Sequence, residues 1–321
     1  MILALAGGVG GAKLANGLAS ILLPNDLVII VNTGDDFSHL GLRISPDIDT
    51  VMYTLAGRSN SEAGWGLAGD TWHFMDALER LRAETWFRLG DRDLATHVER
   101  TRRLKDGQTL SEITVELCKS FGVAHQIAPM TDHTVQTILN TDEGTLPFQH
   151  YFVRRRCEPT VRTIDFIGDR QAEPSPALLA ALSSAELRAI IICPSNPYLS
   201  IHPILSLSHV RNALLNRSVP VVAVSPIIGD AAVKGPAAKL MRDFGHTPSV
   251  VEIARFYAGL IDGLVIDERD EHLRSEIEEM GIRVCVTNAL MKTVADQAFL
   301  ANVTSDFASG INLESRSQPV R

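Results

Sequence analysis

The first thirteen residues, MILALAGGVGGAK, hold the residue types that bind a phosphate group. An apolar run at 2–6 has the length of a buried parallel strand, and a glycine-rich stretch follows it. Glycine lets the backbone approach a ligand closely, and the first N–H groups of a helix attract anions because they lack intrahelical partners. The sequence therefore predicts a phosphate or nucleotide site formed by Gly7, Gly8, Gly10, Gly11 and Lys13.

The standard nucleotide signatures fit this stretch only in part. The dinucleotide pattern G-x-G-x-x-G/A can begin at Gly8, but it meets Lys13 at its last position. The P-loop pattern requires glycine before its lysine and a hydroxyl residue after it, whereas this chain has Ala12 and Leu14. The stretch thus predicts a phosphate or nucleotide without identifying which one. A tight strand-to-helix turn that binds no ligand is the less favoured alternative.

Four aspartates follow within fifteen residues of one another, after a second apolar run at 27–31. The first two come after Asn32 and Thr33, and the second two alternate in the stretch Ser45-Pro46-Asp47-Ile48-Asp49-Thr50. Carboxylate oxygens beside a phosphate are the ligands that Mg²⁺ prefers. A helix capped by Asp49 or Thr50 is the structural alternative. The four candidate ligands are Asp35, Asp36, Asp47 and Asp49.

The elements that would position these residues indicate an α/β fold. Short apolar runs alternate with helical patterns, which is typical of a Rossmann-like, doubly wound and mostly parallel sheet. Two later runs end in polar loops, Pro194-Ser195-Asn196-Pro197 and 225–236, whose hydroxyls, amides and free N–H groups suit a base, a ribose or a diphosphate. The expected strands are 2–6, 27–31, 189–193, 219–225, 264–267 and 283–287.

The middle of the chain, 54–162, is predicted to be an inserted, largely helical subdomain. It holds all three tryptophans, Trp65, Trp72 and Trp86, which could wall a flat ring. A polar concentration runs from Asp91 and Arg92 through His97 to Arg100, and it either starts a solvated helix or closes a site. Short strands are expected over 127–162, including 148–153. The core is then 1–53 and 163–312, and 313–321 is a polar tail.

Composition excludes several classes of protein. The chain has 321 residues, 45% hydrophobic and 21% charged, as in an ordinary soluble globular protein. Its formal charge of −8 argues against nucleic-acid binding, and no apolar run is long enough to span a membrane. The four cysteines lie far apart without metal-ligand spacing, which predicts buried thiols in a reducing cytoplasm.

Stretches spread over nearly the entire chain resemble the 2-phospho-L-lactate transferases of coenzyme F-420 biosynthesis. The resemblance implies a Rossmann-like core with a largely helical insertion. It also implies a Mg²⁺-dependent transfer of a phosphorylated three-carbon acid from its guanosine diphosphate adduct to the 5′-hydroxyl of the deazaflavin Fo, with release of GMP. The acid could be 2-phospho-L-lactate, phosphoenolpyruvate or 3-phosphoglycerate. The stretches are AGGVGGAK, VNTGDD, SPDIDT, LGDRDLATH, PSNP, SPIIGDAAVKGPAAKLM and TNALM.

The resemblance lets roles be assigned to the candidate residues. Asp49 and Arg92 are expected to contact Fo and the reacting groups together with Asp47, and Asp35 and Asp49 are expected to bind the metal. A homodimer is also expected. Asn288 stands where aspartate is expected in the family motif, which puts any role for that carboxylate in doubt. The remaining ligand contacts are assigned to Gly7, Gly8, Gly10, Gly11, Lys13, Asn32 and Thr33, with Ser195, Asn196, Ser225 and Gly235 on the guanosine side.

Two other functions stay open at this point. A related family with a similar glycine-rich start is thought to bind UDP-sugars and to regulate metabolism without catalysis, and LGDRDLATH favours the transferase over it. An NAD(P) oxidoreductase is disfavoured because Lys13 replaces the third small residue of the dinucleotide pattern.

Overall fold

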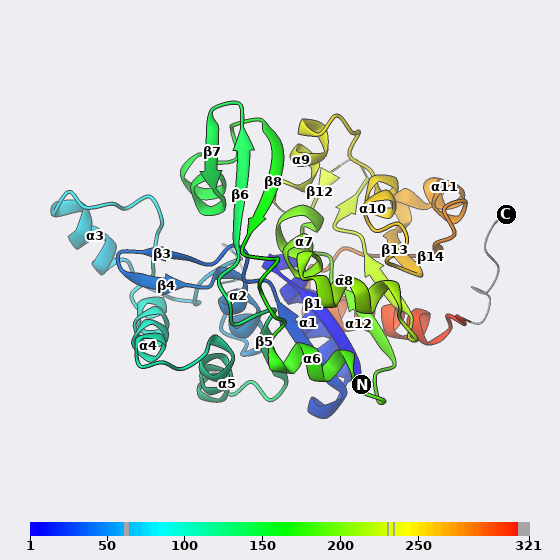
Figure 1. Ribbon diagram of the computed structural model, residues 1–321, viewed down its shortest axis with the longest axis horizontal. Coiled ribbons are helices and arrows are strands. Elements are labelled where there is room, and N and C mark those ends of the chain that lie inside the picture. Colours follow the sequence, from blue (N-terminus) through cyan, green and yellow to red (C-terminus); the bar gives the residue numbers. More distant parts are fainter. Residues whose placement is uncertain (61–63, 230, 234, 314–321) are drawn as a thin grey trace.

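The computed structural model describes residues 1–60, 64–229, 231–233 and 235–313. Its centre is a parallel sheet of seven strands in the order β14-β13-β10-β9-β1-β2-β5 (Figure 1). The strands are β1 (Ile2–Ala6), β2 (Leu27–Val31), β5 (Gln126–Pro129), β9 (Ala189–Ile192), β10 (Val221–Val224), β13 (Gly263–Asp267) and β14 (Arg283–Thr287).

Helices cover both faces of this sheet, so its four central strands, β10, β9, β1 and β2, are apolar throughout. Leu3 and Leu5 of β1 pack into one core, whereas Ile2, Ala4 and Ala6 pack into the other. The second core is closed by α1 (Gly8–Ile21), α2 (Pro46–Leu55), α5 (Leu110–Phe121) and α12 (Val294–Ser309). The first is closed by α6 (Pro176–Leu182), α7 (His202–Ser206), α8 (Ser208–Leu215), α9 (Ala237–Asp243), α10 (Val250–Phe256) and α11 (Arg274–Glu278).

The strand order reverses beside β1. The chain first builds outward through β2 to β5, then returns to the other side of β1 with β9 and continues through β10 to β14. In open α/β sheets ligands bind at such a reversal, just beyond the carboxyl ends of the strands. The loops after β1 and β9 meet at this point.

The segments outside the core reach away from the sheet (Figure 1). On one side the hairpin of β3 (Phe37–His39) and β4 (Leu42–Ile44) accompanies α3 (His73–Arg80) and α4 (Asp93–Lys105). On another, β6 (Gln136–Thr141), β7 (Gly144–Pro147) and β8 (Val161–Ile167) form an antiparallel sheet. Short additional elements are η1 (Pro24–Asp26), η2 (His150–Arg154), η3 (Pro197–Ile201), β11 (Ile227–Ile228), β12 (Ala231–Ala232) and η4 (Glu268–Leu273).

The α/β class and the six predicted core strands are confirmed, with ends that move by no more than two residues. The segment expected as an insertion is divided, however. Its part β5 pairs with β2 as the edge of the main sheet, and α5 packs on the core. A short strand beside helical patterns does not reveal which sheet it joins, because pairing is a long-range choice.

Two local predictions were wrong. The segment 148–153 is not a strand, because it enters the helical turn η2 and buries Tyr151 against Leu139 and Val161. Asp49 and Thr50 do not cap a helix, since α2 already begins at Pro46, whose fixed φ suits the first helical position. The four cysteines carry free thiols, but the prediction that they are buried is confirmed only for Cys118 and Cys193, since Cys157 and Cys285 are half-buried. The predicted tail falls almost wholly on 314–321, outside the described residues.

Within the described ranges, no helix has both the length and the apolarity that a membrane crossing needs.

Candidate active site

A cavity of about 710 Å³ lies at the carboxyl ends of the strands. Its wall combines the loop after β1, the first turns of α2, the loops after β9 and β10, and aromatic residues from the segments outside the core. The sequence predicted ligand-binding residues in each of these loops.

The glycine-rich loop is packed tightly against the rest of this wall. The Gly7 N–H donates to Ser195 Oγ at 3.0 Å, and the Gly8 N–H donates to Asp47 Oδ1 at 2.7 Å. Gly8 has φ +61°, a conformation that favours glycine. A Cβ at Gly10 would collide with the carbonyl of Pro194. Gly7, Gly8 and Gly10 line the cavity, whereas Gly11 is buried against Ser195.

Lys13 lines the cavity one turn further along α1. Its ammonium group donates to the carbonyl oxygen of Met291 at 2.7 Å, which ties α1 to the loop after β14. Asn288, in the same loop, is exposed and accepts the N–H of Leu290 at 3.1 Å.

Asp35 and Asp47 are brought together by Asn32. The Asn32 amide donates to Asp35 Oδ1 and to Asp47 Oδ2, each at 3.0 Å. Burial, and then the neighbouring charges of Asp47 and Asp36, raise the pKa of Asp35 well above its usual range. Burial also raises the pKa of Asp47 to about 6, against hydrogen bonds from Asn32, Gly8 and Ser200. Both carboxyl groups line the cavity.

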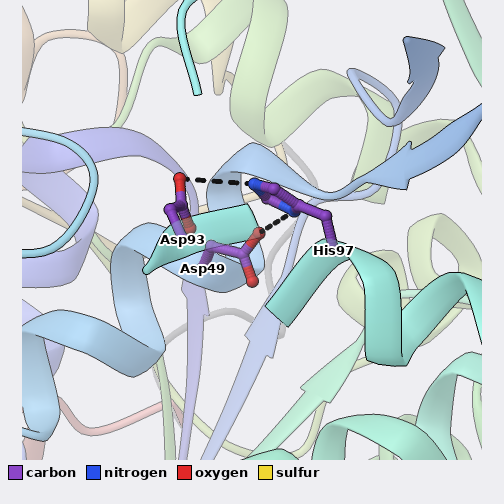
Figure 2. Close-up of side chains that lie close together, drawn as sticks. All are labelled: Asp49, Asp93 and His97. Atoms are coloured by element: carbon purple, nitrogen blue, oxygen red, sulfur yellow. Dashed lines mark ion pairs between the residues drawn. The ribbon is translucent and has the colours of Figure 1, made fainter. Parts of the chain in front are cut away.

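Asp49 has different partners, although it lies only two residues from Asp47. Arg100 donates to both of its oxygens, one of them at 3.0 Å, and the guanidinium is fully buried. Figure 2 shows Asp49 on α2 facing His97 on α4, with Asp93 of α4 on the other side of the imidazole. His97 Nδ1 lies 3.7 Å from Asp49 Oδ2, and His97 Nε2 lies 3.3 Å from Asp93 Oδ2.

A further layer stands behind this group. The Tyr53 hydroxyl donates to Asp93 Oδ1 at 2.7 Å. Burial alone would raise the pKa of Asp93, but the hydrogen bonds from His97 and Tyr53 and the charge of Arg100 lower it. Asp49 is therefore one end of a buried network of compensated charges.

Aromatic residues share the lining of the cavity with the two acidic groups. This lining confirms part of the expectation for the tryptophans, because Trp65 and Trp86 line the cavity and Trp72 does not. Trp72 instead lies under the guanidinium of Arg88, 4.1 Å from its ring centre. The cavity also receives Arg156. The other aromatic residues of the wall are Phe87, Phe148 and Phe152.

Arg92 does not reach the cavity. It is the exposed N-cap residue of α4, and its backbone N–H is held by Asp70 at 2.8 Å. Arg88, four residues earlier, lines the cavity instead. The sequence places both arginines beside the same Gly-Asp turn, and it does not show which one turns inward.

The loops after β9 and β10 supply small polar groups. Ser195 and Asn196 line the cavity, and the amide nitrogen of Asn196 is buried without a hydrogen-bond partner among the described residues. Ser225 and Gly235 line it as well, with positions 230 and 234 of that loop outside the described residues. Thr33 is buried and, like Asn32, lies behind the lining residues.

Reasoning from the sequence did not connect Arg100 and Asp93 with Asp49. A signal was present, since Asp93, His97 and Arg100 recur at i, i+4 and i+7 and so share one face of a helix. Three charged or ionisable residues on an inward face require buried partners, and the sequence alone did not identify Asp49 as that partner.

Comparison with known proteins identifies the family. Residues 2–301 match the family profile described as 2-phospho-L-lactate transferase CofD. The chain belongs to this family. A Methanosarcina mazei protein named 2-phospho-L-lactate transferase is 39% identical over 297 residues, covering 92% of this chain and 97% of the relative. A protein of the same name from Methanopyrus kandleri is 42% identical over 301 residues, covering 92% and 94%.

The relatives within this family carry two names. A Streptomyces griseus protein named phosphoenolpyruvate transferase is 39% identical over 316 residues, covering 97% of this chain and 99% of the relative. A solved structure of a UPF0052-family protein from Bacillus halodurans superposes with a TM-score of 0.62, covering 95% and 98% of the two chains at 13% identity. That likeness shows the shared fold alone. The chain is thus a CofD-family transferase whose phosphorylated acid the names leave open.

Proposed function

We propose that this protein transfers a phosphorylated three-carbon acid from its guanosine diphosphate adduct to the 5′-hydroxyl of Fo, releasing GMP in coenzyme F-420 biosynthesis. One observation carries the proposal: a single cavity joins a helix N-terminus, a pair of buried carboxylates and an aromatic wall. These are the three materials that a diphosphate, a metal ion and a flat acceptor ring require.

The donor fits the half of the cavity beside β1 and β9. The positive end of α1 and the ammonium of Lys13 suit the diphosphate. Gly7 and Gly10 let this end of the helix pack closely against Asp47 and Pro194. Ser195, Asn196, Ser225 and Gly235 suit the guanosine. The unpartnered amide of Asn196 supports this assignment, because a buried donor without an acceptor costs free energy that a bound ligand recovers.

Mg²⁺ fits Asp35 and Asp47 better than it fits the group around Asp49. The first pair offers hard oxygen ligands, and burial raises the pKa of both carboxyls, a cost that a bound divalent cation would offset. Asp49, Asp93 and His97 also offer ligand atoms within 4.8 Å of one another. There, however, Arg100 already binds both oxygens of Asp49, and a second cation beside a guanidinium is repelled.

The predicted metal pair of Asp35 with Asp49 is therefore replaced in our proposal by Asp35 with Asp47. A bound Mg²⁺ would neutralise charge on the donor's phosphates. The protein itself holds the two carboxylates side by side, because the Asn32 amide donates to both of them. The Gly8 N–H fixes Asp47 against the glycine-rich loop.

The acceptor fits the other half of the cavity. Trp65, Trp86 and Phe152 offer flat apolar surface to the deazaflavin ring, and Arg88 stands beside it. The 5′-oxygen attacks the phosphorus of the phospho-acid while the bond from that phosphorus to the bridging oxygen of GMP breaks. The hydroxyl proton passes to the Asp49 carboxylate and then to water. Positioning and charge neutralisation suffice, and no covalent intermediate is needed.

A nucleotide-binding screen followed by an assay tests this proposal. We expect purified protein to bind GDP and GMP in preference to UDP-sugars and NAD, and to convert Fo with Mg²⁺ and one guanylylated acid into a product whose mass identifies that acid. The two names of the relatives make phospholactyl and enolpyruvyl donors the first to compare. A preference for UDP-sugar, with no product from any donor, would support a regulatory function instead.

A further inference from the structure

Arg100 is the most deeply buried charge beside the cavity. Its side chain has no exposed surface, and the largest fully buried side chain of the described residues belongs to it. Burying a guanidinium is costly unless a counter-ion and hydrogen bonds compensate for it. Here the compensation comes from Asp49, because two guanidinium nitrogens donate to the two carboxylate oxygens.

The ion pair fixes the orientation of Asp49. A carboxylate held by the planar fork of arginine cannot rotate without breaking two hydrogen bonds. The same guanidinium lies 3.3 Å from His97 Nδ1, and His97 Nε2 lies 3.3 Å from Asp93 Oδ2. Tyr53 anchors Asp93 in turn. Asp49 itself lines the cavity, whereas Arg100 does not.

We propose that Arg100 is a positioning residue for the transfer: it holds Asp49 as a fixed, charge-compensated acceptor for the hydroxyl of the acceptor substrate. This inference rests on the proposed function. Arg100 acts through Asp49 and touches no substrate. Because its charge already balances Asp49, it also keeps that carboxylate from competing with Asp35 and Asp47 for a divalent cation.

Arg100→Lys tests the inference, because lysine keeps the charge and loses the two-pronged geometry. We expect a folded variant by circular dichroism, GDP affinity within twofold of the wild type, and kcat reduced at least tenfold. The matched control is Arg103→Lys on the same helix. Arg103 pairs with Glu99 at 2.6 Å on the partly exposed side, and its variant should retain wild-type kcat.

A double-mutant cycle separates positioning from general structural support. If Arg100 acts through Asp49, Arg100→Lys should lower the residual transfer of the Asp49→Asn protein by less than twofold. A tenfold loss in that background, or wild-type kcat in the single variant, overturns the inference. A variant that fails to fold, or that loses GDP binding, shows a structural role and overturns it as well. Absence of product from the wild-type protein with every donor contradicts the proposed function and removes the inference with it.

Discussion

Asp47 and Asp49 lie two residues apart in the first turn of α2, and both line the same cavity, yet they have opposite electrostatic surroundings. Residues at i and i+2 of a helix point to different sides. Asp47 therefore faces Asp35 and neutral donors, whereas Asp49 faces the guanidinium of Arg100. Burial raises the pKa of Asp35 and Asp47, whereas the guanidinium of Arg100 compensates the charge of Asp49. The difference teaches that the neighbouring charged and hydrogen-bonding groups decide which of two aspartates can bind a cation.

The largest effect should appear in the stability of Asp49→Asn. The change leaves Arg100 buried without its counter-ion, and breaking such a pair costs about 3–5 kcal/mol. Urea unfolding measures this loss. Asp106→Asn is the control, because its ion pair with Arg102 lies at the surface and should contribute less than about 1 kcal/mol. Equal stability of the two variants would show that Asp49 does not compensate Arg100.

Asp47→Asn should act on transfer. It removes one of the two charges assigned to Mg²⁺ while keeping an oxygen that can accept the Gly8 N–H, so the fold is retained. We expect kcat/KM to fall about 10²-fold or more, which is roughly 2.7 kcal/mol of transition-state stabilisation. The measurement is product formation at saturating Mg²⁺, with circular dichroism as the check on folding. Activity within about threefold of the wild type would remove Asp47 from the site.

The buried carboxyl groups of Asp47 and Asp36 should also make the stability of the protein depend on pH. Burial raises the pKa of Asp47 to about 6 and that of Asp36 to about 7, both from 3.8. The folded state therefore binds more protons than the unfolded chain between pH 4 and pH 7, so the stability these groups contribute is complete below pH 4 and is lost as pH rises through 6 to 7. For Asp47 the loss is about 3 kcal/mol.

Unfolding at pH 5 and pH 7.5 without Mg²⁺ measures this dependence. We expect the free energy of unfolding to fall between the two values in the wild type and to fall less in Asp47→Asn. Asp93 does not contribute to this difference, because its pKa is lowered and it therefore changes the stability only below about pH 4. An identical pH dependence of the unfolding free energy in the two proteins would mean that folding does not raise the pKa of Asp47.

The smallest effect concerns the acceptor half of the cavity. Arg88→Ala should weaken Fo about tenfold, which is roughly 1.4 kcal/mol, and leave GDP affinity unchanged, because Arg88 lines the cavity beside the aromatic wall. Arg92→Ala is the control, since Arg92 is exposed outside the cavity, and it should change neither affinity. Quenching of tryptophan fluorescence by Fo reports on Trp65 and Trp86. Loss of GDP binding in Arg88→Ala would place this arginine at the diphosphate.

The sequence predicted the core well because each buried strand is a continuous apolar run with a polar loop behind it. It also assigned the glycine-rich loop and the loop that holds Ser195 to one nucleotide-linked ligand, and both loops line the cavity. It did not predict the pairing of Asp49 with Arg100, which depends on how α4 packs against α2. For the same reason it chose Arg92 where Arg88 lines the cavity, and it left β5 outside the main sheet.

The central claim is that a divalent cation binds between Asp35 and Asp47 and not at Asp49. Locating a bound metal ion in a crystal tests this claim most directly. Crystals soaked with Mn²⁺, an anomalous scatterer that replaces Mg²⁺, should show a single anomalous peak between the carboxylates of Asp35 and Asp47, and crystals of Asp47→Asn should lose it. A peak among Asp49, Asp93 and His97 instead, with the Arg100 side chain displaced, would contradict the account.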